Sequence, residues 1–356
     1  MKNPFKFGTI VENEYFTDRI DELKTICQTM DSENHLILIS PRRFGKSSLV
    51  LKAVKQIGRP YISLNLQKVV SVSDFAAAIL KEVFKLHPWE RMKHLMQHFR
   101  VVPTISANPI TQGIDVAFQP MTDESIALED ALHLLEKVSD PRQRLIVIFD
   151  EFQEVMSLSK GIDKRLRAIM QEQHGLNYIF LGSQESMMTE IFERKKSPFY
   201  HFGKLMVLKK LPHDDFLEYL CLRLQPVAHA QTNDIATQIL ETTQCHPYYT
   251  QQLAAQVWDL LTYQHTEKNV VATAIEQVVT THDLDYERLW LTFNKTDRRI
   301  LQMLCRDQNP MTNHQLATST AYSSLKKLTQ QGYLIRTTAY EIEDPFFRRW
   351  IEKNQL

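Results

Sequence analysis

Gly45, Lys46 and Ser47 have the residue types and spacing of a phosphate-binding loop. Glycine lets the backbone approach a phosphate, because no Cβ restricts its φ angle. The lysine ammonium is expected to reach the β- and γ-phosphates, where it would assist catalysis, and the serine hydroxyl to ligate Mg²⁺. Backbone N–H groups at the start of the following helix would point at the anion. The predicted nucleotide-binding residues here are Pro41, Arg42, Arg43, Phe44, Gly45, Lys46, Ser47 and Ser48.

The surroundings of this loop strengthen a prediction that Gly-Lys-Ser alone supports weakly. Four apolar residues, Leu36 to Ile39, predict a short buried strand before it, and a helical pattern follows from Lys46. Ser40 stands where the usual phosphate-loop pattern has its first glycine. An ordinary basic turn is the alternative interpretation of the same residues.

Two acids end a second apolar run, Leu145 to Phe149. Such a run predicts a central parallel strand that is buried on both faces. Its carboxylates would emerge at the carboxyl edge of the sheet, where open α/β sheets hold their ligands. Asp150 is the predicted Mg²⁺ ligand, and Glu151 is the predicted group that orients or deprotonates an attacking water. A solvated acidic turn is the alternative.

Two further positions are candidates for contact with a nucleotide. The predicted strand 177–184 ends in Ser183 and Gln184, and Ser183 is the candidate catalytic residue that senses the γ-phosphate. Pro247 is expected to start a helix, which would bring that helix's N-terminus and His246 near the base or the phosphates. A plain turn at Gly182-Ser183 and a plain helix junction at 245–247 explain the same residues.

Composition narrows the class of protein. The 356 residues contain 42 basic and 42 acidic side chains, so no global charge indicates nucleic acid or an acidic partner. The cysteines, at 27, 221, 245 and 305, have no metal or disulfide spacing, which is typical of reduced thiols. No stretch has the apolar length of a signal peptide or a membrane span. These features predict a soluble cytoplasmic protein without a membrane partner.

The elements that would position these residues alternate between strands and helices up to residue 212. Strands are expected at 36–39, 61–66, 145–149, 177–184 and 205–208, and helices near 17–26, 46–58, 73–83, 88–99, 123–138 and 162–173. Alternation of this kind predicts an α/β protein with a parallel sheet covered on both faces. Residues 101–119 have a two-residue period broken by Asn108-Pro109 and Gly113, which predicts an inserted β-hairpin.

Two further domains are predicted after this core of residues 1–212. Residues 213–283 have helical patterns and would form a lid that closes on nucleotide. Residues 284–356 have the order helix, helix, helix, hairpin, with the short second helix at Asn313–Ala317, which predicts a winged-helix domain. Its third helix, 322–331, presents Lys326 and Lys327, and duplex DNA is one candidate partner there. A protein client or self-association is the other.

The whole pattern resembles the archaeal-type ATPase family, P-loop proteins of the STAND/AAA+ group. The motifs that carry the resemblance are Asn3-Pro4-Phe5, Phe16 to Leu23, Ser40 to Leu49, Phe149 to Gln153, Gly182-Ser183, His246-Pro247-Tyr248 and Asp344-Pro345-Phe346 near Trp350. In that family the missing first glycine at position 40 is expected, whereas glycine is common where this chain has Cys245. The resemblance implies an AAA+-like core with a lid and a winged helix, and binding and slow hydrolysis of ATP with Mg²⁺.

Three functions compete on these grounds. The first is a Mg²⁺-ATP-dependent conformational switch coupled to the winged helix, in which catalysis is positioning plus electrostatics. The second is a DNA-binding regulator or an origin-recognition-like ATPase. The third is a scaffold that holds ATP or ADP without turnover and binds protein partners.

Overall fold

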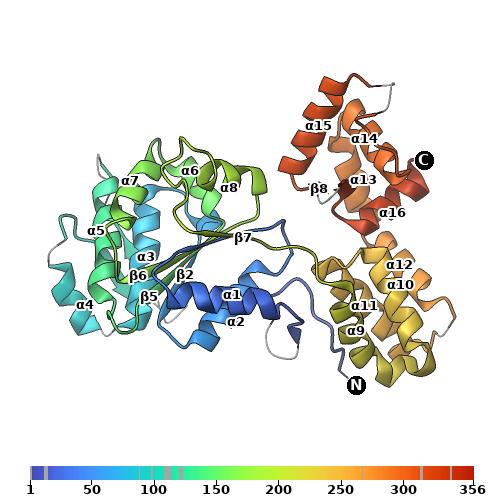
Figure 1. Ribbon diagram of the computed structural model, residues 1–356, viewed down its shortest axis with the longest axis horizontal. Helices are drawn as coiled ribbons and strands as arrows, with labels where there is room; N and C mark the ends of the chain where they lie inside the picture. Colours follow the sequence, from blue (N-terminus) through green and yellow to red (C-terminus); the bar gives the residue numbers. More distant parts are fainter. Residues whose placement is uncertain are drawn as a thin grey trace. The chain divides into compact units, whose positions relative to one another are not determined.

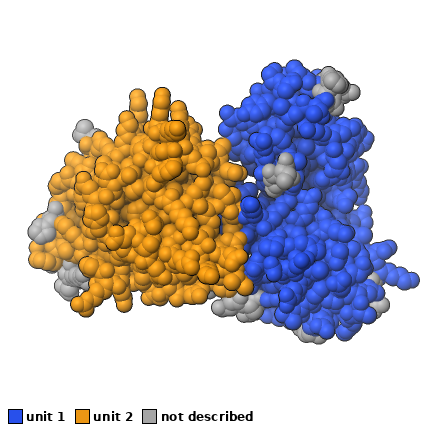
Figure 2. Space-filling model, in the orientation of Figure 1, with its two compact units in different colours: residues 1–19, 41–48, 209–356 blue, residues 20–40, 49–208 orange. Residues whose placement is uncertain are grey.

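The computed structural model describes residues 2–11, 15–87, 89–97, 99–107, 114–119, 123–266, 268–312, 316–336 and 339–356. The chain forms two compact units, which Figure 2 distinguishes by colour. Unit 1 contains residues 1–19, 41–48 and 209–356, and unit 2 contains residues 20–40 and 49–208. The predicted division into a core, a lid and a winged-helix domain stays a prediction, and the units are described here separately.

A five-stranded parallel sheet is the centre of unit 2 (Figure 1). Its strands are β1 (Leu36–Ile39), β2 (Tyr61–Asn65), β5 (Leu145–Asp150), β6 (Leu176–Gly182) and β7 (Lys204–Val207), in the order β2-β5-β6-β1-β7. Every neighbouring pair is parallel, so all five carboxyl ends lie at one edge. The predicted α/β class and parallel sheet are therefore confirmed, and β1, β5 and β6 have almost the predicted bounds.

Helices cover both faces of this sheet (Figure 1). One face carries Ile37, Val147 and Phe180, which share a buried cluster with residues of α3 (Val72–Leu86), α5 (Ser125–Val138), α7 (Ile162–Met170) and α8 (Glu185–Phe192). Alternate strand residues such as Leu38 and Ile148 point to the other face and are also buried. Two helices supply the apolar cover there, α1 (Ile20–Asp31) and α2 (Lys46–Ile57).

The remaining elements of unit 2 are short. They are the 3-10 helices η2 (Leu66–Lys68) and η3 (Phe152–Glu154), the helices α4 (Trp89–Met96) and α6 (Val155–Leu158), and the strands β3 (Thr104–Ala107) and β4 (Ile114–Ala117). β3 and β4 pair antiparallel in a separate two-stranded sheet, so the predicted hairpin at 101–119 is confirmed. Residues 108–113, where its turn was predicted, lie outside the described residues.

Two predicted helix starts are wrong. Asp18 and Arg19 have positive φ angles of 47° and 70°, so they cannot begin a right-handed helix, and α1 starts at Ile20. Helix α3 starts at Val72 and not at residue 73, because Ser71 is its N-cap and its hydroxyl accepts the N–H of Asp74. A side-chain acceptor two residues before the predicted start thus sets the beginning of the helix.

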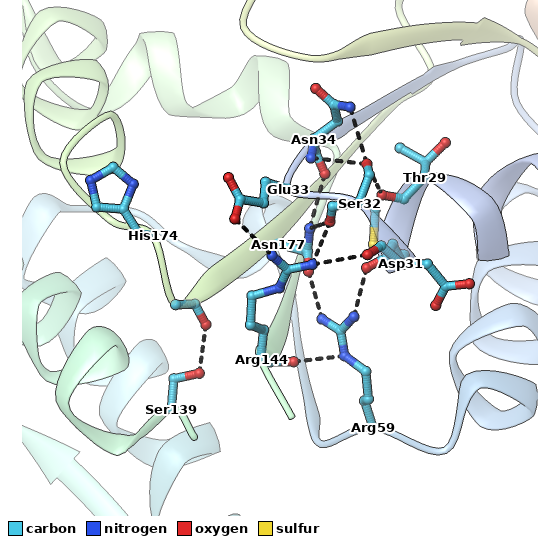
Figure 3. Close-up of polar contacts among 12 residues, drawn as sticks. Thr29, Asp31, Ser32, Glu33, Asn34, Arg59, Ser139, Arg144, His174 and Asn177 are labelled. Carbon is cyan, nitrogen blue, oxygen red and sulfur yellow. Dashed lines mark hydrogen bonds and ion pairs between the residues drawn. The ribbon is translucent and has the colours of Figure 1, made fainter. Parts of the chain in front are cut away.

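The amino edge of the sheet is closed by a set of hydrogen bonds that we call the amino-edge network (Figure 3). Arg59 donates to the carbonyls of Met30 (2.6 Å) and Arg144 (2.9 Å) and to Asn177 Oδ1 (2.6 Å). Two further groups cap the same end of α1: Asn177 Nδ2 donates to the carbonyls of Ser32 and Asn34, and Arg144 to those of Asp31 and Ser32. The last carbonyls of α1 are thereby satisfied by side chains from the strand starts.

Unit 1 is helical apart from one small hairpin. Its helices are α9 (His213–Ala228), η4 (His229–Gln231), α10 (Thr232–Thr243), α11 (Pro247–Tyr263), α12 (Val270–Thr281), α13 (Asp283–Thr292), α14 (Lys295–Cys305), α15 (Thr318–Gln330) and α16 (Pro345–Asn354), and its strands are β8 (Leu334–Arg336) and β9 (Tyr340–Ile342). One continuous apolar cluster joins them and includes Phe216, Trp258, Leu325 and Phe346. No helix among the described residues is long and apolar enough to cross a membrane.

Part of what the sequence predicts for residues 284–356 is present in the structure. Helices α14 and α15 and the hairpin β8–β9 are present, and α15 starts four residues before the predicted helix. The predicted short helix at Asn313–Ala317 falls mainly on 313–315, which lie outside the described residues. Helices α13 and α16 were not predicted, and the winged-helix assignment stays a prediction.

Candidate functional site

The loop 41–48 follows β1 and runs into the first turn of α2, so it leaves the sheet at the carboxyl edge. Gly45 has a φ angle of +85°, and a Cβ built there would meet no heavy atom within 4 Å. Glycine is therefore required for the left-handed backbone and not for lack of space. Lys46 is only 6% exposed and its Nζ donates to the carbonyl of Pro41 at 3.1 Å. A buried ammonium at a helix start favours an anion.

Two residues of this loop are held by the start of α11, which also belongs to unit 1. The ring of Phe44 is buried and lies 4.8 Å from the His246 ring. Arg43 has a φ angle of 65°, its guanidinium donates to Tyr249 Oη at 2.9 Å, and it stacks 4.7 Å from the Tyr248 ring. The loop residues Phe44 and Arg43 are thereby fixed by three aromatic side chains within four positions of the chain, His246, Tyr248 and Tyr249.

His246 caps α11, and Pro247 is that helix's first residue, as predicted. The imidazole Nδ1 accepts the N–H of Tyr248 at 3.2 Å, which leaves the proton on Nε2. Nε2 lies 3.4 Å from Glu343 Oε1 but makes no well-aligned hydrogen bond. Burial lowers the pKa of His246 and outweighs the opposing effect of Glu343, so the neutral imidazole is favoured.

A chain of polar contacts continues from Arg43 toward the last helix. Tyr249 Oη accepts from Arg43 and donates to Glu343 Oε2 at 2.7 Å, and burial raises the pKa of Tyr249. Glu343 precedes Asp344, whose carboxylate caps α16 by accepting the N–H groups of Phe346 and Phe347. Sequence reasoning did not identify Tyr249 or Glu343. The only signal was their position next to the motifs at 246–248 and 344–346.

The carboxyl edge of unit 2 carries the second set of predicted residues, Asp150, Glu151 and Ser183, which form a strand-end cluster together with Gln153. Asp150 Oδ1 accepts the N–H of Glu151 at 3.0 Å. Glu151 has φ 55° and ψ 49°, a left-handed conformation that is strained for a residue with a Cβ. Its Oε2 accepts from Gln153 Nε2 (2.7 Å), Ser183 Oγ (2.5 Å) and Ser183 N (3.2 Å). The predicted catalytic residues Glu151 and Ser183 are therefore in direct contact.

Other predicted residues have less definite surroundings. Arg42 is exposed, and Ser47 is half-buried in the first turn of α2. Ser48 Oγ accepts the N–H of Val11 at 3.1 Å, so it serves the backbone of the N-terminal segment. Lys326 is exposed on α15, whereas Lys327 Nζ lies 2.5 Å from the carboxylate of the fully buried Asp297. Lys327 is thus engaged inside its own unit.

The oxygen groups predicted to hold Mg²⁺ match the chemistry of that ion. Mg²⁺ takes hard oxygen ligands and keeps several waters, so one hydroxyl and one carboxylate are enough protein ligands when phosphate oxygens complete the shell. The two predicted ligands are of this kind: Ser47, in unit 1, carries a hydroxyl, and Asp150, in unit 2, carries a carboxylate that is partly buried at the end of β5. The donor set fits Mg²⁺ better than a metal that needs nitrogen or sulfur.

Solved structures of a Walker-type ATPase and of two ORC proteins have a similar fold. A Walker-type ATPase of Pyrococcus abyssi aligns over 96% of this chain and 97% of its own, with a TM-score of 0.66 and 15% identity. The Aeropyrum pernix ORC2 protein, solved in ADPNP-ADP complexes, aligns over 98% of this chain and 96% of its own, with a TM-score of 0.58 and 13% identity.

The Aeropyrum pernix ORC1 protein, solved in complex with DNA, aligns over 96% of this chain and 94% of its own, with a TM-score of 0.53 and 10% identity. No protein-family model matches the sequence, and no curated protein does either. At these identities the likeness establishes the fold alone.

Proposed function

We propose that this protein binds and hydrolyses Mg²⁺-ATP and uses the bound nucleotide as a conformational switch. The observation that carries the proposal is the loop 41–48 itself. It follows strand β1 of the parallel sheet, holds Gly45 in the left-handed region and buries the ammonium of Lys46 at the start of α2. A loop of this kind is built to hold phosphate.

Each loop residue has a role in this proposal. Lys46 places its charge on the β- and γ-phosphates, and backbone N–H groups from Arg42 to Ser48 surround them. Ser47 and Asp150 would hold Mg²⁺, which would neutralise charge that develops on the phosphate oxygens. His246 and Pro247 contact the nucleotide beside Phe44, whose ring His246 already touches. Arg42 and Arg43 supply further positive charge.

In this proposal the strand-end cluster carries out the hydrolysis. A water oxygen attacks the γ-phosphorus, the bond from that phosphorus to the β,γ-bridging oxygen breaks, and ADP and inorganic phosphate are formed. The water proton passes to Glu151, the general base. Oε1 is the atom in position for this, because Oε2 already accepts from Gln153 and Ser183. Ser183 is the predicted sensor of the γ-phosphate.

The switch is supported by the contacts from Arg43 through Tyr249 to Glu343. A phosphate bound by the loop competes for the Arg43 guanidinium, because a doubly charged anion is a stronger partner than a phenol oxygen. Loss of that hydrogen bond removes one of the contacts on Tyr249, which donates to the residue before the α16 cap. Bound nucleotide would in this way alter how the segment 334–354 packs within unit 1.

The test is ATP turnover by the purified full chain with Mg²⁺, beside Glu151→Gln. The variant should bind ATP as the wild type does and lose turnover by at least about 100-fold. Glu154→Gln, three residues on in η3, is the matched control and should keep normal turnover. Full activity of Glu151→Gln would remove its role, and a wild type that binds ATP without any turnover would favour a nucleotide-binding scaffold.

The coupling to segment 334–354 has its own measurement. Hydrogen–deuterium exchange of α16 should differ between the ATP-bound and the nucleotide-free protein. Tyr249→Phe, which removes both hydrogen bonds of the hydroxyl, should abolish that difference while ATP still binds. An unchanged nucleotide response in Tyr249→Phe would contradict this route.

Duplex DNA is a second candidate ligand, and two observations favour it. The exposed side of α15 carries Tyr322 and Lys326, and one protein of similar fold has been solved with DNA. Binding should weaken as salt rises, and Lys326→Ala should reduce the salt dependence by about one counterion. Lys327→Ala is the control, because Lys327 is paired with Asp297. Absence of salt-sensitive binding would leave a protein client as the partner.

A further inference from the structure

Gln153 is a buried residue whose side-chain amide contacts the carboxylate of Glu151. Its side chain has no exposed surface, and its Nε2 donates to Glu151 Oε2 at 2.7 Å. Ser183 donates twice to the same oxygen, through its hydroxyl and its backbone N–H. Three donors from two elements, η3 and the turn after β6, therefore converge on one carboxylate oxygen.

The orientation of the Gln153 amide is fixed by its surroundings. If the amide were rotated by 180°, Oε1 would face the carboxylate and two acceptors would repel each other. In the observed orientation Oε1 is buried and has no hydrogen-bond partner. Leaving such an acceptor unpaired destabilises the folded state, because the desolvation of the oxygen is not compensated. An apolar side chain of the same length would avoid that cost, so the donor, and not the volume, accounts for a glutamine here.

Gly182 provides the space that this amide occupies. A Cβ at position 182 would lie 2.9 Å from Gln153 Oε1 and 2.3 Å from Met188 Cγ, so no larger residue fits without moving them. The last residue of β6 thus lacks a side chain where the amide must pass to reach Glu151. Both donors to the Glu151 carboxylate are therefore positioned by the end of β6: Ser183 follows Gly182 directly, and Gln153 occupies the space beside it.

We propose that Gln153 is a positioning residue for Glu151. It holds Oε2, so that Oε1 faces the attacking water in one orientation. The inference rests on the proposed function of Glu151 as the general base. Gln153 is needed beside Ser183 because the predicted contact of Ser183 with a γ-phosphate would use the hydroxyl that now donates to Glu151. During hydrolysis Gln153 would then be the remaining side-chain donor.

The decisive variant is Gln153→Met, which keeps the length of the side chain and removes the donor. We expect kcat for ATP to fall about tenfold, because the base is no longer held in one orientation. The dissociation constant of ATP, measured by calorimetry, should stay within about twofold, since no loop contact is lost. An unchanged kcat would overturn the proposal, and a parallel loss of kcat and affinity would show a structural role instead.

Gln173 offers a matched control within the same unit. It is also buried, its Nε2 donates to the carbonyl of Leu132 at 2.8 Å, and its Oε1 accepts from the hydroxyl of Tyr178. Gln173→Met should lower the melting temperature while kcat, measured well below melting, remains normal. If Gln173→Met lowers kcat as much as Gln153→Met does, the effect is one of general stability and the proposal fails.

A second readout does not depend on turnover. In protein labelled with ¹⁵N in glutamine side chains, the Gln153 amide signal is identified by its loss in Gln153→Met. We expect its Nε2 protons to exchange slowly with solvent in the wild type and to shift and exchange faster in Glu151→Ala. An amide signal indifferent to Glu151→Ala overturns the positioning role. Absence of wild-type turnover with a responsive amide signal would refute only the proposed hydrolysis.

Discussion

The two edges of the parallel sheet in unit 2 are built from the same strands and differ in how their polar groups are satisfied. At the amino edge, the side chains of Arg59, Arg144 and Asn177 donate hydrogen bonds to backbone carbonyls. Arg59 also donates to Asn177, which is fully buried. At the carboxyl edge, Glu151 is in a strained backbone conformation and Gln153 Oε1 has no partner. Satisfied groups stabilise a fold, whereas strain and unpaired groups mark a site that is prepared for a ligand.

This difference predicts that substitutions at the carboxyl edge change function with little effect on stability, and that the amino edge does the reverse. Substitutions at both edges test that separation.

Lys46→Ala should weaken ATP binding by at least about 100-fold, because the charge that faces the phosphates is lost. The free energy of unfolding should change by less than about 1 kcal/mol. Isothermal calorimetry and urea unfolding measure the two quantities. Lys55→Ala, in the last turn of the same helix, is the control and should leave binding unchanged. Wild-type affinity in Lys46→Ala would remove the loop from the proposed site.

Asn177→Leu should lower the free energy of unfolding by about 3 kcal/mol, since it removes the acceptor of one Arg59 N–H, the donor to the Asn34 carbonyl and one of two donors to the Ser32 carbonyl in a buried place. Urea unfolding provides the measurement, and ATP affinity should not change. Asn34→Ala is a suitable control, because the exposed Asn34 amide contacts only Ser32 Oγ and its backbone carbonyl stays. A variant that loses ATP affinity at native stability would show that the two edges are not separate.

His35 at the start of β1 predicts how stability depends on pH. Burial, with a smaller effect of the Arg167 charge, lowers its pKa from 6.5 to about 4. The unfolded chain therefore binds the proton first, and stability is lost as pH falls from about 6.5 toward 4, by up to about 3 kcal/mol. His35→Asn can still accept the N–H of Tyr178, as Nδ1 does. The pH dependence of its unfolding should be flatter, and an identical dependence would contradict the assignment.

Glu33→Ala should have the smallest effect, below about 0.5 kcal/mol. Glu33 is 87% exposed and lies 3.7 Å from Arg144, which keeps its bonds to the carbonyls of Asp31 and Ser32. Thermal melting at low and high salt measures the difference. A loss comparable to that of Asn177→Leu would mean that the network depends on this outer charge.

Local patterns predicted most of this fold. The apolar runs 36–39 and 145–149 became β1 and β5, because a strand buried on both faces leaves a continuous signal. Boundaries set by single side chains were less predictable, as the Ser71 cap and the left-handed Asp18 and Arg19 show. Each depends on a hydrogen bond or a backbone angle that several sequences would allow.

The predicted site residues fall in two sets, one around the loop 41–48 and one at the ends of β5 and β6. The contacts that join residues within each set could not be predicted. Tyr249 and Glu343 are 94 positions apart, and Glu151 and Ser183 are 32 apart. Such pairs are brought together by tertiary packing, which leaves no periodic pattern and no local change of composition in the sequence. The interaction between Glu151 and Gln153 is local, yet its buried donor becomes visible only once the orientation of the turn is known.

The turn before α11 has a consequence for the evolution of this chain. Gln244 and Cys245 both have left-handed backbone angles, with φ of 50° and 57°. Glycine would relieve the backbone strain at either position, although at 244 it would remove the hydrogen bond that Gln244 Oε1 accepts from Lys210 Nζ at 3.1 Å. Cys245 stands where the resembling family often has glycine. Substitutions in this turn would therefore change the backbone freedom next to the His246 cap in small steps, without altering any group proposed to meet the nucleotide.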